Sequence, residues 1–189
     1  MLRLVTAGAL AAFFLTLLSA PAGMAAGAGQ QLSMLSTLQP DRVVVLKAER
    51  RLVLMRGDQV LKVYRVALGR YAKGAKWRQG DAKTPEGIYT LDYRLDKSAF
   101  YKAIHISYPN PRDRARARSM GVDPGGKIMI HGIANGWTPV ELGHPSLDWT
   151  QGCIAVTNRE MDEIWRLVKT GTPISSLTFF KTARPRSNP

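Results

Sequence analysis

The chain contains a single cysteine, Cys153, within the segment Thr150-Gln151-Gly152-Cys153. A lone thiol cannot form a disulfide within the chain, so it is either a small buried apolar residue or a nucleophile. The apolar neighbour Ile154 favours burial. Gly152 favours the nucleophile, because a residue without a side chain lets a substrate approach the backbone closely. The N–H groups of Gly152 and Cys153 could then stabilise an oxyanion.

A nucleophilic cysteine needs a base, and the chain offers three histidines. His105 lies in an alternating apolar segment, which is typical of a solvent-facing strand residue. His131 ends the apolar run 128–130 and precedes Gly132, so it lies at a strand end. His144 lies in a predicted loop. Because a strand end positions a side chain more rigidly than a loop does, we expect His131 to be the base.

The imidazole of the base needs an acceptor for its second nitrogen. Glu141, Asp148 and the carbonyl oxygen of Gly132 are all candidates, and the spacing does not choose between them. A metal site formed by His131, His144 and Asp148 is a weaker alternative, because the spacing is not that of a helical H-E-x-x-H motif. We expect no metal and no organic cofactor.

The elements that must position these residues are mainly β. The predicted strands comprise residues 43–47, 52–55, 60–68, 88–93, 103–107, 128–130 and 172–180. Thr157 and Glu160 form a capping box that begins a helix, and Gly171 follows its end. The segment 109–126, rich in proline and glycine, reads as a long surface excursion. The expected fold is a β-rich α+β domain with one or two packed helices.

The first residues resemble a secretory signal peptide. Arg3 precedes the apolar run 4–18, and small residues follow as far as the candidate cleavage sites after Ala25 and Ala28. We therefore expect residues 1–28 to direct export to the periplasm or cell envelope. An uncleaved membrane anchor is the alternative.

Three segments follow this leader. Residues 29–40 read as a linker, residues 41–180 as one domain, and residues 181–189 as a tail. Because the 189 residues leave room for one domain of ordinary size, we expect a single activity.

The composition is strongly basic, with a formal net charge of +13. Residues 47–83 carry eleven cations and three acids, and four arginines form a second cluster at 112, 114, 116 and 118. Most of these side chains are expected to form a solvated face. A basic surface would also concentrate an exported protein on anionic envelope polymers. Nucleic acid, the other common partner of a basic protein, conflicts with export.

Two motifs together resemble a known family. Ile130-His131-Gly132, and Thr150-Gln151-Gly152-Cys153-Ile154 with Asn158, are similar to the signature of the L,D-transpeptidase (YkuD-type) catalytic domain. Further segments agree in order: Val66-Ala67-Leu68-Gly69, Thr84-Pro85-Glu86-Gly87-Ile88-Tyr89 and Ile106-Ser107-Tyr108-Pro109-Asn110. The resemblance covers about residues 41–177.

The resemblance implies a sandwich-like fold and a cysteine enzyme that acts on peptidoglycan stem peptides in the envelope. By position, Cys153 is the nucleophile, His131 the base and Gly132 the residue whose carbonyl orients the base. An acyl-enzyme on Cys153 would be resolved by an amine, and the thiol would be open to capture by a carbapenem. With water as acceptor, the same residues would make a carboxypeptidase or an amidase.

The chain departs from the family's pattern at two positions. Gln151 stands where a histidine is usual, and it can donate a hydrogen bond but cannot carry a proton. Ala155 stands where an arginine is usual, which removes a cation that could hold a substrate carboxylate. Hydrolysis of a peptidoglycan peptide or peptidoglycan–protein link is therefore an alternative, and a weakly active peptidoglycan-binding module is another.

Four further side chains are candidates for contact with substrate. Trp137 and Trp149 could stack on sugar or peptide, and His144 and Tyr108 lie in motifs beside the expected site. Residues 135–147 are predicted to form an added lip over it.

Overall fold

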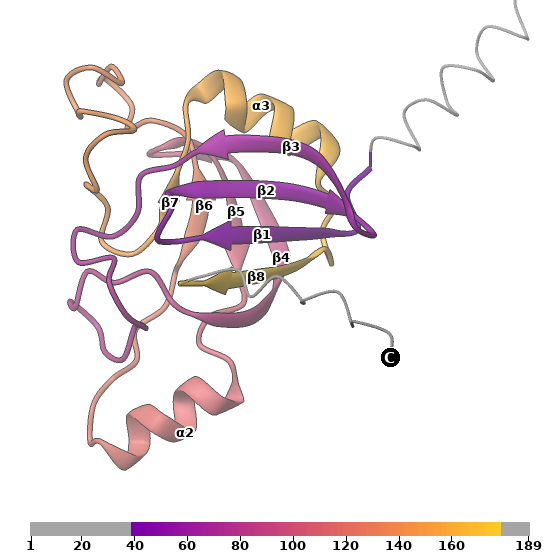
Figure 1. Ribbon diagram of the computed structural model, residues 1–189. Coiled ribbons are helices and arrows are strands. Elements are labelled where there is room, and N and C mark those ends of the chain that lie inside the picture. The colour runs from indigo at the N-terminus through magenta and orange to yellow at the C-terminus, as the bar shows by residue number, and fades with distance from the viewer. Residues whose placement is uncertain (1–38, 179–189) are drawn as a thin grey trace, which may run out of the picture. The chain divides into compact units, whose positions relative to one another are not determined.

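The computed structural model describes residues 39–178 (Figure 1). The expected signal peptide, most of the 29–40 linker and the 181–189 tail lie outside the described residues. Within 39–178, neither helix is long and apolar enough to cross a membrane.

The described chain has eight strands and two helices, which confirms the expected β-rich fold; the short strand at 154–155 was not predicted. The strands are β1 Arg42–Leu46, β2 Arg51–Arg56, β3 Gln59–Arg65, β4 Gly87–Ser98, β5 Tyr101–Ile106, β6 Met129–His131, β7 Ile154–Ala155 and β8 Pro173–Leu177. The helices are α2 Pro111–Ser119 and α3 Asn158–Leu167. The strand order is β3-β2-β1-β8-β4-β5-β6-β7.

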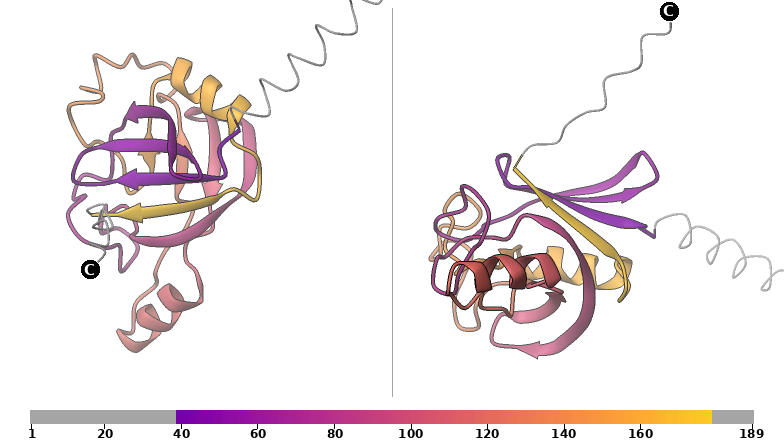
Figure 2. Two further views of the ribbon diagram at one scale, coloured as in Figure 1. Left: turned by 45° about the vertical axis from the view of Figure 1, so that its right-hand side comes forward. Right: turned by 90° about the horizontal axis from the view of Figure 1, so that it is seen from below.

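The long strand β4 joins two halves of this sheet. Its first residues, 87–90, pair with β8, which in turn lies parallel to β1. Its later residues pair with β5 through two register shifts. These irregularities let β4 curve between the two halves, which face one another as layers (Figure 2). The two layers therefore match the sandwich-like fold that the family resemblance implies.

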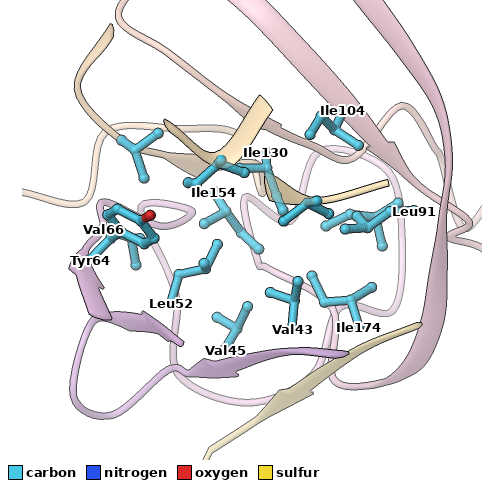
Figure 3. Close-up of a cluster of buried hydrophobic side chains, with 14 of the residues drawn as sticks. Val43, Val45, Leu52, Tyr64, Val66, Leu91, Ile104, Ile130, Ile154 and Ile174 are labelled. Atoms are coloured by element: carbon cyan, nitrogen blue, oxygen red, sulfur yellow. The ribbon is translucent and has the colours of Figure 1, made fainter. Parts of the chain in front are cut away.

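The core lies between these layers (Figure 3). Val43 and Val45 of β1 project inward at alternate positions, and Ile130 of β6 and Ile154 of β7 approach from the other layer. Each is almost wholly buried. Burying a side chain of this size contributes about 1.5–3 kcal/mol. The two short strands that carry the candidate site are thus anchored directly in the core.

Helix α3 begins as the capping box predicts. The Thr157 hydroxyl accepts from the Glu160 N–H, and the Glu160 carboxylate accepts from the Thr157 N–H. Met161 and Ile164 on the apolar face are buried in the core. Trp165, which follows Ile164, is only half-buried against this core.

Helix α2 corrects the prediction of an irregular excursion over 109–126. Asn110 and Asp113 form a second capping box, with Pro111 in the first turn. The buried Asp113 carboxylate also accepts from the Tyr89 hydroxyl at 3.0 Å and pairs with Arg116 at 2.7 Å. Helix α2 therefore forms by capping and by one buried carboxylate, without an apolar stripe.

Lys47, directly after β1, is a buried cationic side chain, with 2% of its surface exposed. Its ammonium donates to the carbonyl oxygens of Gly74 and Thr84, both at 2.7 Å, and to the Glu86 carboxylate at 2.9 Å. Three acceptors meet the three N–H groups of the ammonium. This cluster ties β1 to the loop 66–86.

Candidate active site

The two expected catalytic residues lie on neighbouring parallel strands. His131 ends β6, and Cys153 immediately precedes β7. His131 is in register with Ala155. Registered residues of parallel strands point to the same side, and so do residues two positions apart. If the alternation of β7 extends back by one residue to Cys153, its side chain lies on the same side of the sheet as that of His131.

The His131 ring is held by its neighbour's carbonyl group. Nδ1 lies 2.7 Å from the carbonyl oxygen of Gly132. A carbonyl oxygen can only accept, so Nδ1 carries the proton and Nε2 is left with a free lone pair. Of the other candidate acceptors, Glu141 bonds within its own loop, and Asp148 pairs with Arg50 at 2.7 Å. The acceptor for the second ring nitrogen of His131, which the sequence did not decide, is therefore the carbonyl oxygen of Gly132.

Position 132 favours glycine because the first residue of α3 packs closely against it. A Cβ atom there would lie 2.5 Å from Oδ1 of Asn158, the first residue of α3. The same Oδ1 accepts from the Ile133 N–H at 2.8 Å. Asn158 thereby fixes the backbone that orients the His131 ring.

Thr150 and Gly152 shape the turn that presents Cys153. The Thr150 hydroxyl donates to the Cys153 carbonyl oxygen at 2.8 Å and accepts from the Gly152 N–H at 3.1 Å. Gly152 has a φ of +127°, and a Cβ there would lie 2.6 Å from the Lys83 carbonyl oxygen. Because the Gly152 N–H is already engaged, the Cys153 N–H is the remaining oxyanion donor of the two expected.

The motif glycine Gly69 packs beneath the same turn. Its N–H donates to the Thr84 hydroxyl at 3.0 Å, and a Cβ at position 69 would lie 2.2 Å from the Ala82 carbonyl oxygen and 3.0 Å from the Gly152 Cα. Two motifs that are distant in sequence therefore meet as the support for the cysteine turn.

Burial keeps the thiol and imidazole neutral at rest. It raises the pKa of Cys153, although the Met129 N–H and the Lys76 ammonium act to lower it. Burial also lowers the pKa of His131 to about 4, against the Gly132 hydrogen bond and with help from His144. The Cys153 sulfur donates to the Lys127 carbonyl oxygen at 3.7 Å. At rest Cys153 is therefore a thiol and not a thiolate, and His131 is an imidazole and not an imidazolium.

Aromatic rings surround the buried imidazole. The Phe100 ring centroid lies 4.5 Å from that of His131, and the Trp149 centroid lies 5.7 Å away. His144 contacts Trp149 edge-on, and neither of its ring nitrogens has a hydrogen-bond partner. Phe100, in the β4–β5 turn, was missed by the sequence analysis because no local pattern links it to a residue 31 positions later.

The other residues that were expected at the site lie in different surroundings. Trp137 is 57% exposed in the 135–147 loop. Tyr108 is only 3% exposed, and its hydroxyl donates to the Pro124 carbonyl oxygen. This burial leaves Tyr108 no surface for substrate, so we do not retain it as a contact residue. Gln151 is exposed and lines a cavity of about 600 Å³.

The metal hypothesis gains no support from the geometry. Across residues 39–178, no group of three or more His, Cys, Asp or Glu side chains is arranged to hold a metal ion. Asp148, the expected carboxylate ligand, is engaged by Arg50 and by the Leu68 N–H.

Comparison with known proteins gives one family match and several relatives. The family model of the L,D-transpeptidase catalytic domain (YkuD) matches residues 40–175. YafK of Escherichia coli (strain K12), which is named among the L,D-transpeptidases, is 36% identical over 135 residues, covering 68% of this chain and 47% of YafK. The chain thus spans about half the length of the curated relatives it matches.

Solved structures show the same fold. Bd1075 of Bdellovibrio bacteriovorus is 26% identical with a TM-score of 0.51, covering 73% of this chain and 48% of Bd1075. The helical cell shape determining protein Pgp2 of Campylobacter jejuni is 22% identical with a TM-score of 0.55, covering 80% of this chain and 56% of Pgp2.

Proposed function

Because this chain belongs to the L,D-transpeptidase catalytic domain (YkuD) family, we propose that it is a cysteine acyltransferase acting on peptidoglycan stem peptides. Cys153 is the nucleophile and His131 the general base. The observation that carries this proposal is the 2.7 Å contact from His131 Nδ1 to the Gly132 carbonyl oxygen, which leaves Nε2 free to take a proton on the side of the sheet that Cys153 faces.

The proposed reaction has two acyl-transfer steps. His131 Nε2 takes the proton of the Cys153 thiol as the sulfur attacks a peptide carbonyl carbon, and the Cys153 N–H stabilises the oxyanion. The amide bond breaks, the leaving amine takes the proton from His131, and a thioester remains on Cys153. An acceptor amine then attacks the thioester and gives a proton to His131, the C–S bond breaks, and His131 returns the proton to the Cys153 sulfur.

The expected leader and the basic surface support action in the envelope. We propose that residues 1–28 direct export and that the net charge of +13 favours residence on anionic envelope polymers. The proposed substrate is itself a component of that envelope.

A hydrolytic outcome is the second candidate, and Ala155 favours it. This residue is fully buried in β7, and its N–H and carbonyl oxygen both bond to Ala67. The alanine side chain carries no charge, so position 155 does not offer the cation that is usual there. Without that cation, water could compete with an amine for the thioester.

Product analysis separates transfer from hydrolysis. A disaccharide-tetrapeptide is incubated with the protein, with and without an added D-amino acid, and the muropeptides are separated by chromatography and mass spectrometry. We expect loss of the terminal residue in both reactions and exchange when the amine is present. Products without exchange would indicate hydrolysis. Equal products with Cys153→Ala would contradict the proposed function.

The lowered pKa of His131 predicts that kcat/KM falls only at an unusually low pH. A base with a pKa of about 4 stays unprotonated through mildly acidic pH, so kcat/KM should fall to half near pH 4 and not near 6.5. The measurement is kcat/KM from pH 3.5 to 8, with circular dichroism at each pH to exclude unfolding. An acid limit near pH 6.5 in folded protein would contradict the lowered pKa of His131.

A further inference from the structure

The helix α2 carries two exposed arginines that the fold does not use. Arg114 and Arg118 are four positions apart, so they lie on one face of the helix, about 6 Å apart along its axis. Arg116, by contrast, pairs with the buried Asp113. Among the described residues, neither Arg114 nor Arg118 has an acidic partner. Two unpaired guanidinium groups therefore stand side by side at the surface.

This arginine pair is costly to the helix that holds it. Like charges at this spacing destabilise a helix, and α2 has no apolar stripe to compensate. Figure 1 shows that α2 projects from the body of the sheet. Arg118 lies in the last turn, where a cation is favourable, but no acidic side chain of the described residues offsets the repulsion between the two arginines, and a ligand of opposite charge would offset it.

The pair lines a groove that continues toward the thiol. Arg114 and Arg118 border a groove of about 330 Å³, which Asp123 and Gly125 also line. Asp123 and Gly125 form part of the wall of the larger cavity as well, the one lined by Gln151. The two hollows are therefore adjacent.

The far wall of the larger cavity reaches the candidate nucleophile. Lys127 lines this cavity, and its carbonyl oxygen accepts from the Cys153 thiol. Gln151 stands two residues before Cys153. A ligand that lies along the two hollows thus extends from α2 to the edge of the cysteine turn.

We propose that Arg114 and Arg118 bind a carboxylate of the peptidoglycan stem peptide whose amide bond reacts at Cys153. The inference rests on the proposed function and adds how its substrate is recognised. A guanidinium fork matches the geometry of a carboxylate, and Val122 with two prolines gives the groove apolar walls for the aliphatic part of a peptide. The Asp123 carboxylate repels an anion near the cavity, which places the bound carboxylate over α2.

The test pairs a change in the protein with a change in the substrate. The variant R114Q/R118Q and the wild-type protein are each assayed with a stem tetrapeptide and with the same peptide whose free side carboxylates are amidated. We expect the double variant to raise KM for the acidic peptide about tenfold, with kcat within about twofold. We expect the amidated peptide to lose the same factor with wild type and to show no further loss with the variant.

A matched control removes two exposed arginines elsewhere. The variant R65Q/R112Q changes the net charge equally, and Arg112 lies on the opposite face of α2. Its KM should stay within about twofold of wild type. An equal rise in KM for both variants would show that only net charge matters and would overturn the inference.

Two further outcomes are decisive. If R114Q/R118Q loses binding to vesicles containing phosphatidylglycerol while KM for the peptide is unchanged, the pair serves a lipid surface and the inference is wrong. If wild-type Cys153 is never acylated by any peptide, the proposed function itself fails. Normal acylation with unchanged KM in the variant would remove only the role of the arginines.

Discussion

Replacing His131 with alanine lowers the rate of Cys153 acylation by about 10²–10⁴-fold, because no group remains to take the thiol proton. The raised pKa of Cys153 makes this loss large, since few molecules carry a thiolate at neutral pH without a base. The rate is measured as the time course of acyl-enzyme formation by intact-mass spectrometry with a stem tetrapeptide.

The matched control for this substitution is His144→Ala. His144 contacts Trp149 but forms no hydrogen bond to the site, so its loss should slow acylation at most several-fold. Because His131 is buried, His131→Gln is assayed as well, since it fills much of the same space without supplying a base of suitable pKa. Equal losses for His131→Ala and His144→Ala, with both proteins folded, would reassign the base.

Replacing Lys47 with methionine lowers the free energy of unfolding by about 3–5 kcal/mol. The change removes the ammonium donor from the carbonyl oxygens of Gly74 and Thr84, and it leaves the Glu86 carboxylate with the Thr178 hydroxyl but no cation. Although burial acts to raise the pKa of Glu86, the hydrogen bonds from Lys47 and Thr178 hold it below its ordinary value. Urea denaturation followed by circular dichroism measures the loss.

A second lysine–glutamate pair serves as the control for Lys47. Lys62 pairs with Glu163 at 2.8 Å on the surface, where an ion pair contributes about 0–1 kcal/mol. Lys62→Met should therefore change stability little. Adding Glu86→Gln to Lys47→Met should recover part of the loss, because it removes the unpaired charge. A cost for Lys47→Met no larger than that for Lys62→Met would refute the role of the cluster.

The strands and helix α3 could be predicted because their signals are local. Short continuous apolar runs mark β1 and β2, and the Thr157–Glu160 capping box marks α3. The sequence analysis missed helix α2 because its four arginines and its mostly exposed residues give no apolar periodicity. Its capping residues, Asn110 and Asp113, are a signal that could have revealed it.

The candidate catalytic residues could be proposed from the sequence, but the groups that pack around them and hold them could not. Cys153 and His131 stand out because a lone thiol in a chain with an expected export signal needs a reason, and because a strand end positions a base. The ring of Phe100, the Lys127 carbonyl group and the Gly69 contact come from distant segments. Sheet pairing and loop packing bring these groups together, and neither can be read from spacing.

Intact-mass spectrometry of the protein after exposure to a carbapenem tests the role of Cys153 most directly. We predict that wild type gains the mass of one inhibitor, that peptide mapping places the adduct on Cys153, and that Cys153→Ala gains none. A folded wild type that stays unmodified at neutral pH, or an adduct of equal yield in Cys153→Ala, would contradict a nucleophilic thiol at this position.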